Sequence, residues 1–262
     1  MTRFGVALEI TPPRDRNPDV LLRRAGLLGS SADSIHVIQR PGRQTSLDAS
    51  IELARAGLAA VWHVVNRGRT SAEIEREVEC AARAELGAAL VVRGEGVLED
   101  PPDTPPLRSV VARIRAALPR ARVGVTLNPY VDPARALANL WPKLEAGASF
   151  IQTQPVFSAT TLHGVAEPVR ARAPGVAIVP MVIPLLSAAA AEKLALRLRL
   201  PLPAGLVARL ARGGDATGWA LFAETIRDLK ASGLADGVAV MTQEMDPDGA
   251  FGERVRAALR GD

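Results

Sequence analysis

The sequence predicts a single (β/α)8 barrel that spans residues 1–262. Two patterns support this fold. Eight short runs rich in Val and Ile recur along the chain, and each is nearly continuous in hydrophobicity, as expected for parallel strands covered on both faces. Amphipathic segments with helical spacing lie between these runs, and no change in composition marks a domain boundary. Such an alternation of eight strands with helices is typical of a closed barrel.

The predicted strands are short apolar runs that polar or glycine-containing segments separate. In order along the chain, they cover residues 4–10, 34–38, 60–65, 89–93, 122–127, 150–154, 177–183 and 237–241.

The predicted helices have recognisable ends. A helix over 47–57 ends at Gly57, and a helix over 71–86 begins at the capping residue Ser71. The next predicted helix has a proline in its first turn and stops at a glycine. These later helices cover residues 133–146, 215–232 and 251–259.

An open, doubly wound sheet is the alternative fold. That fold usually has a glycine-rich phosphate turn after its first strand, whereas residues 9–14, Glu-Ile-Thr-Pro-Pro-Arg, contain no glycine. The proline-rich segment 100–106 follows the fourth strand, so it is expected to be a loop of the barrel and not a linker between domains.

Composition excludes several classes of protein. The chain is 48% hydrophobic and 23% charged, which is ordinary for a protein with a large core and excludes general disorder. Its single cysteine, Cys80, excludes an internal disulfide framework and a cysteine-rich zinc site. No spacing of His, Asp and Glu suggests another metal site, so none is expected.

The expected partners are small molecules in the cytoplasm. The longest apolar stretch, 176–191, contains two prolines and is shorter than the ~20 residues of a membrane helix. Glu9 comes too early for a signal peptide. The formal charge is +4, but basic residues alternate with acidic ones and only 3% of residues are aromatic, so nucleic acid is not an expected partner. The sequence leaves a homo-oligomer open.

Polar residues stand at the carboxyl ends of the predicted strands, where barrel enzymes place their active sites. Glu9 ends the first strand within an apolar run, so its carboxyl is expected to be partly buried, and such a group is costly unless it is paired or protonated. Carboxylates and an arginine at one barrel mouth are suited to proton transfer. The full set is Glu9, His63, Arg93, Glu95, Asn128, Gln152, Gln154, Gln243 and Glu244.

Five motifs in register resemble the methylenetetrahydrofolate reductases. Residues 6–14, with a glutamate followed by two prolines, resemble that family's opening strand. The strand ending in His63 resembles its Pro-His-Leu-Thr segment, and Val-Arg-Gly-Glu at 92–95 resembles its Leu-Arg-Gly-Asp. Asn-Pro-Tyr-Val-Asp-Pro at 128–133 and Lys-Leu-Glu-Ala-Gly-Ala at 143–148, followed by Thr153-Gln154, resemble two later motifs.

The resemblance implies a (β/α)8 barrel that reduces methylenetetrahydrofolate to methyltetrahydrofolate with NADH or NADPH, through bound FAD. It implies that Glu9 is the catalytic acid that assists protonation of folate N10. Substrate contacts would come from Gln154, Glu95 and Leu194. Cofactor contacts would come from His63, Arg93, Asn128, Asn139 and Lys143.

Several of that family's flavin contacts are replaced. A threonine, an aspartate and an arginine of the family correspond to Ile38, Ala136 and Pro142, and a histidine corresponds to Asp132. Another arginine, after the eighth strand, corresponds to Met245. We therefore expect FAD to bind weakly or not at all, so that hydride passes directly from NAD(P)H to folate.

Two other functions remain open. One is a non-catalytic barrel that binds folate or a nucleotide. The other is an unrelated barrel enzyme such as an aldolase. The aldolase is disfavoured because none of Lys143, Lys193 and Lys230 lies at a strand end, where a Schiff base would form, and no glycine-rich phosphate loop follows the seventh or eighth strand.

Overall fold

A computed structural model shows a closed barrel of eight parallel strands in chain order, which confirms the predicted fold. The structure describes residues 3–94, 99–242 and 246–261. The first and last strands pair with each other, so the sheet has no open edge. The strands are β1 (Gly5–Ile10), β2 (Ser34–Val37), β3 (Ala60–Val65), β4 (Ala88–Val92), β5 (Arg122–Leu127), β6 (Phe150–Pro155), β7 (Ala177–Val182) and β8 (Gly237–Met241).

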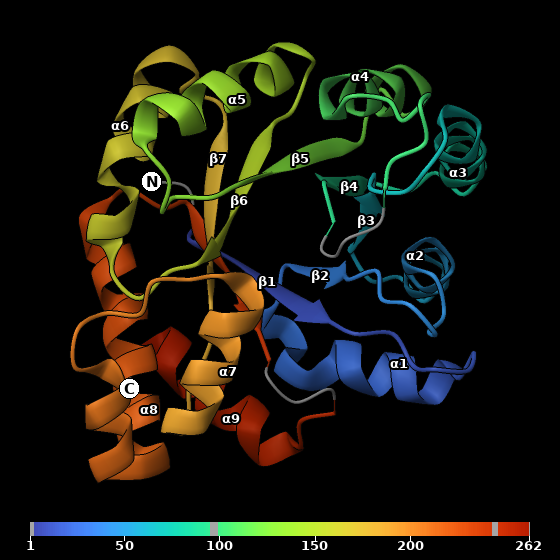
Figure 1. The fold of residues 1–262 in the computed structure, drawn as a ribbon. Helices are drawn as coiled ribbons and strands as arrows, with labels where there is room; N and C mark the ends of the chain where they lie inside the picture. Colours follow the sequence, from blue (N-terminus) through green and yellow to red (C-terminus); the bar gives the residue numbers. More distant parts are fainter. Residues whose placement is uncertain (1–2, 95–98, 243–245, 262) are drawn as a thin grey trace.

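Helices surround the strands (Figure 1). They are α1 (Pro18–Ala25), α2 (Ser46–Arg55), α3 (Ser71–Arg83), α4 (Leu107–Ala117), α5 (Pro133–Glu145), α6 (His163–Arg172), α7 (Ala188–Leu198), α8 (Leu206–Ser232) and α9 (Gly249–Arg260), with the 3₁₀ turns η1 (Gly26–Ser31) and η2 (Ala159–Leu162). None of the helices in the described ranges combines the length and the apolar character that crossing a bilayer requires.

Local signals define several helix ends. Helix α3 begins with a capping box, in which Thr70 Oγ1 accepts from the backbone N–H of Glu73 and the Glu73 carboxylate accepts from that of Thr70. Helix α8 starts nine residues before the predicted 215–232 and changes direction at Gly214, whose φ of 56° and ψ of −145° suit only glycine. The segment 100–106 precedes α4 as the predicted loop.

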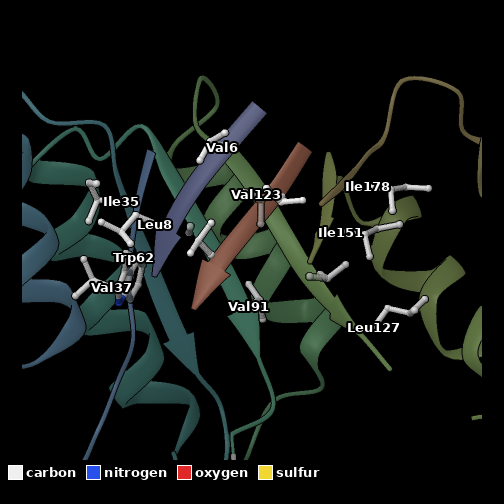
Figure 2. Close-up of a cluster of buried hydrophobic side chains, with 14 of the residues drawn as sticks. Val6, Leu8, Ile35, Val37, Trp62, Val91, Val123, Leu127, Ile151 and Ile178 are labelled. Carbon is white, nitrogen blue, oxygen red and sulfur yellow. The ribbon is translucent and has the colours of Figure 1, made fainter. Parts of the chain in front are cut away.

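The main core lies between the barrel and its helices. Alternate strand residues point outward, as the period-two geometry of a strand requires, and they pack against the apolar faces of the helices. Figure 2 shows part of this layer, with Trp62 of β3 among aliphatic side chains. The labelled members are Val6, Leu8, Ile35, Val37, Trp62, Val91, Val123, Leu127, Ile151 and Ile178.

A smaller cluster fills part of the barrel interior. Phe150, Val61 and Leu90 pack together inside the strands. On the neighbouring strand, a Cβ at Gly124 would lie 2.2 Å from the Phe150 ring. The glycine is needed because the aromatic ring occupies the space of a side chain. The interior above this cluster, toward the carboxyl ends of the strands, is polar.

Candidate active site at the carboxyl end of the barrel

Glu9 and Gln152 meet across the barrel interior. Glu9 lies on β1 and is 7% exposed, which confirms its expected burial, and Gln152 lies on β6 and is 1% exposed. These strands are not neighbours in the barrel, so their inward side chains meet across its axis. Gln152 Nε2 donates a hydrogen bond of 3.1 Å to Glu9 Oε2. The amide therefore holds one oxygen of the candidate acid.

A pair of buried histidines lies beside this contact. His36 of β2 and His63 of β3 approach with 3.4 Å between His36 Nδ1 and His63 Nε2. The backbone N–H of His63 donates to Ser46 Oγ, which itself donates to the Val37 carbonyl, so the first residue of α2 joins both strands. The resemblance placed His63 at a flavin contact; in the structure, its ring is 6% exposed and engaged with His36.

Burial keeps both imidazoles neutral. It lowers the pKa of His36 to about 4, with a smaller lowering by the charge of Arg122 and an opposing effect of the nearby Gln152 side chain. Burial also lowers the pKa of His63 well below its usual value, and the neighbouring His36 adds to this effect. The pair can therefore donate and accept hydrogen bonds at neutral pH without carrying charge.

The free energy of unfolding is expected to fall as the pH decreases from about 6.5 to about 4. In that range, unfolded imidazoles bind protons that the folded His36 and His63 do not, so acid favours the unfolded state. For His36 alone the loss approaches about 3 kcal/mol near pH 4, since each pKa unit corresponds to about 1.4 kcal/mol.

Urea unfolding at several pH values measures the slope of the free energy of unfolding against pH. His36→Gln should flatten it, whereas His163→Gln, at an exposed histidine, should leave it unchanged. Equal slopes in all three proteins would show that His36 is not a buried neutral imidazole. Comparing slopes, not absolute stabilities, removes the cost of replacing a buried ring.

Gln154 presents an unsatisfied acceptor near the end of β6. Its Oε1 is buried and has no hydrogen-bond partner. An unpaired buried carbonyl costs ~1–3 kcal/mol, so a ligand N–H at this position would gain that free energy. Gln154 follows Gln152 by two residues toward the carboxyl end of β6, in a segment where the register of β6 against β7 shifts.

Three predicted cofactor residues share one pocket. Asn128, Asn139 and Lys143 line a space of about 480 Å³ between the end of β5 and α5, which we call the β5–α5 pocket. Lys143 is 6% exposed, and burial lowers the pKa of its amine. Within the described ranges, no carboxylate lies within ion-pair distance of its Nζ. The pocket therefore offers a cation to an anionic ligand.

Arg93 lies in a different pocket. With Asn66 and Asp100, it lines a space of about 380 Å³ near the ends of β3 and β4. Arg93 forms an ion pair with Asp100, which lowers the pKa of that carboxyl together with a hydrogen bond from the Gly68 N–H. Asn66 Oδ1 is buried here without a partner. Because Asp100 neutralises it, Arg93 is a weaker anion site than Lys143.

The other predicted site residues lie elsewhere. Leu194 of α7 is 3% exposed in a second apolar cluster with Met241, at the end of β8. Glu95, Gln243, Glu244 and Met245 lie outside the described residues. Lys193 and Lys230 are on α7 and α8, away from strand ends. In the parts of the chain that the structure covers, no cluster of three or more His, Cys, Asp or Glu side chains could hold a metal ion.

Sequence reasoning missed His36 and Asn66. A period-two signal could have found His36, since Ser34 and His36 alternate with the outward Ile35 and Val37 on β2. Asn66 directly follows β3, as a polar residue in the position favoured for barrel sites. Gln152 was recognised as a polar strand residue, but not as the partner of Glu9.

Comparison with known proteins gives the family. The family model described as methylenetetrahydrofolate reductase matches residues 2–246. The chain belongs to the methylenetetrahydrofolate reductase family. No curated protein sequence matches it.

Solved structures share the barrel of this family member. One is described as an uncharacterized protein from Clostridium thermocellum that binds two copies of 5-methyl-5,6,7,8-tetrahydrofolic acid; it is 14% identical, with a TM-score of 0.70 over 99% of this chain and 95% of that one. A tryptophan synthase from Mycobacterium tuberculosis is 15% identical, with a TM-score of 0.56 over 99% and 91%. At these identities, the likeness establishes the fold alone.

Proposed function

We propose that the protein reduces 5,10-methylenetetrahydrofolate to 5-methyltetrahydrofolate, with hydride supplied directly by NADH or NADPH. The observation that carries the proposal is the buried Glu9 carboxyl at the carboxyl end of β1, held by Gln152. The resemblance of residues 6–14 to the opening strand of this family implies that Glu9 is the acid that acts on the folate.

Glu9 would supply the proton in the first step. A proton from its carboxyl passes to folate N10, the bond between N10 and the methylene carbon breaks, and the electron pair of N5 forms the iminium. Hydride from the dihydronicotinamide then adds to the methylene carbon to give the methyl group, and solvent returns a proton to Glu9.

Gln154 would orient the pterin or the nicotinamide. Its unpaired Oε1 suits an N–H of the pterin ring or of the carboxamide. Gln154→Ala is therefore expected to weaken binding of folate or dinucleotide by roughly 1–3 kcal/mol. Calorimetric titration measures this change; unchanged affinity for both ligands, in a variant with wild-type thermal stability, would remove Gln154 from the site.

The β5–α5 pocket would receive the anionic part of the dinucleotide. Lys143 provides a buried positive charge, and the side chains of Asn128 and Asn139 add polar groups beside it. Arg135 also lines the pocket and adds a second cation. Asp132, which caps α5 by accepting from the Arg135 N–H, adds a negative charge at the amino end of the helix, whereas Lys143 lies in its last turn.

These residues do not fit a tightly held FAD. Ala136 and Pro142 of α5 offer no side-chain hydrogen bond, and Asp100 already neutralises Arg93. A diphosphate and a ribityl chain lose many bonds to water on binding, and unpaired groups cost ~1–3 kcal/mol each. In the proposed reaction, hydride therefore passes directly from the dinucleotide to the folate.

An anaerobic assay with 4-deuterated NADH tests the proposal. The expected result is NADH oxidation matched by formation of methyltetrahydrofolate that carries the deuterium, in protein whose visible spectrum lacks flavin bands. Added FAD should leave the rate unchanged. Turnover that depends on added FAD, with micromolar or tighter FAD binding, would overturn the direct route and restore flavin chemistry.

A second candidate is a folate-binding barrel without turnover. The Clostridium thermocellum structure that shares this fold is described only as binding methyltetrahydrofolate. Folate binding without product formation, with either NADH or NADPH and with or without FAD, would overturn the proposed reduction and support this candidate.

A further inference from the structure

A second cavity opens at the amino end of the barrel, opposite Glu9. It has a volume of about 830 Å³, within the range of small-molecule sites. Barrel interiors are usually filled by bulky branched side chains. Here five of the inward positions at the strand starts carry no side chain or only a methyl group, which leaves space in the barrel end. These positions are Gly5, Ala7, Ala88, Ala177 and Gly237. We call this space the basal cavity.

Aromatic and apolar groups form the inner wall of the basal cavity. The Phe150 ring lies between two other groups that also line the cavity. His36 meets it edge-on, with 6.1 Å between ring centroids, and the Arg122 guanidinium lies 5.4 Å from its centroid on the side of the strand starts. The wall therefore offers a cation over an aromatic ring, with small apolar side chains around them.

The positive charge of Arg122 is not compensated. The two carboxylates at the cavity are already engaged: Asp33 accepts from the Val6 N–H and pairs with Arg3, and Asp236 accepts from the Ile178 N–H and pairs with Arg170. Across the residues that the structure covers, no carboxylate comes within 4.0 Å of the Arg122 guanidinium.

Arg122 also acts on the cavity interior. Its electric field makes the smallest of the three contributions to the shifted pKa of His36, whose main cause is burial. An anion placed beside Arg122 would meet this field, while apolar walls would remain for the rest of the molecule. A small polyanion such as phosphate would leave those walls uncovered, so the lining favours a ligand with one charge and a hydrophobic body.

We propose that the basal cavity binds a small organic carboxylate with a flat apolar body, its carboxylate beside Arg122 and its ring against Phe150. The carboxylate and the guanidinium form a charge-assisted pair, and the planar fork of arginine suits both carboxylate oxygens. Offset or edge contact of the ligand ring with Phe150 adds to the buried apolar area. This site is independent of the proposed reduction.

Calorimetric titration with 2-naphthoate tests the site. We expect binding that Arg122→Gln weakens about tenfold or more, since it removes a charge-assisted bond. Arg120→Gln, at a nearby exposed arginine outside the cavity, is the matched control and should leave the affinity unchanged. Ala88→Leu should abolish binding by filling the space. Neutral 2-naphthamide should bind at least about tenfold more weakly than 2-naphthoate.

The histidine signals in an NMR titration report where the probe binds. The chain has three histidines, so each imidazole signal can be assigned from a single variant. Binding at the basal cavity should move the His36 signal and leave the exposed His163 unmoved. Lys143→Met should not change the affinity, because Lys143 lines the separate β5–α5 pocket. No measurable binding, or binding that is sensitive to Lys143→Met and insensitive to Arg122→Gln, would overturn the proposal.

Discussion

Glu9→Gln is expected to lower turnover of methylenetetrahydrofolate by about 10²–10⁴-fold, the usual contribution of general acid catalysis. The amide cannot deliver the proton that folate N10 requires. Its oxygen can still accept from Gln152 Nε2, so the contact across the barrel and the fold should survive. Steady-state rates, together with folate titration of the same protein, separate lost chemistry from lost binding.

The control for this change is Glu79→Gln, at an exposed carboxylate on α3 far from the barrel axis. It makes the same chemical replacement and should leave the rate unchanged. Reduction by Glu9→Gln at a rate near that of the wild type would remove Glu9 as the acid, whereas lost folate binding would point to a binding role.

Trp62→Ala is expected to lower the free energy of unfolding by about 3–5 kcal/mol, the typical cost of truncating a buried aromatic side chain. Trp62 is 1% exposed and points outward from β3 into the layer between barrel and helices (Figure 2). Its removal leaves a cavity in packing that cannot collapse, because strands border it on one side and helices on the other.

Trp219→Ala is the matched comparison, since Trp219 of α8 is only partly buried and packs at the edge of the same core. Trp219→Ala should lower the free energy of unfolding by less than Trp62→Ala does. Chemical denaturation of both variants measures the two differences. Equal losses would show that Trp62 is no better packed than a residue at the core edge.

Hydrophobic pattern was sufficient to predict the strands. Every predicted strand overlaps an observed one to within two residues at each end, because barrel strands are buried on both faces and leave a continuous apolar run. Several helices were harder to predict from the sequence. Helix α4 follows Pro106 without a side-chain cap, α6 contains Pro168, and the first part of α8 ends at the Gly213-Gly214 pair, so each carries a signal that usually marks a loop.

The sequence was sufficient to predict individual residues of the candidate site, but it was not sufficient to predict which of them contact one another. Position at a strand end drew attention to Glu9 and Gln154. The pairing of Glu9 with Gln152 joins residues 143 positions apart and depends on barrel closure, which no local pattern encodes. The ion pair of Arg93 with Asp100, seven residues further along the chain, also has no signal in the local pattern.

Because β1 pairs with β8, the barrel cannot close until the last strand has been synthesised. Gly5–Ile10 leaves the ribosome first, yet its second neighbour, Gly237–Met241, follows about 230 residues later. Until then one edge of the nascent sheet has unpaired backbone groups, which can recruit strands from other chains. A chain that stops before Gly237 would keep that edge permanently, so we expect premature termination products to aggregate rather than persist as folded fragments.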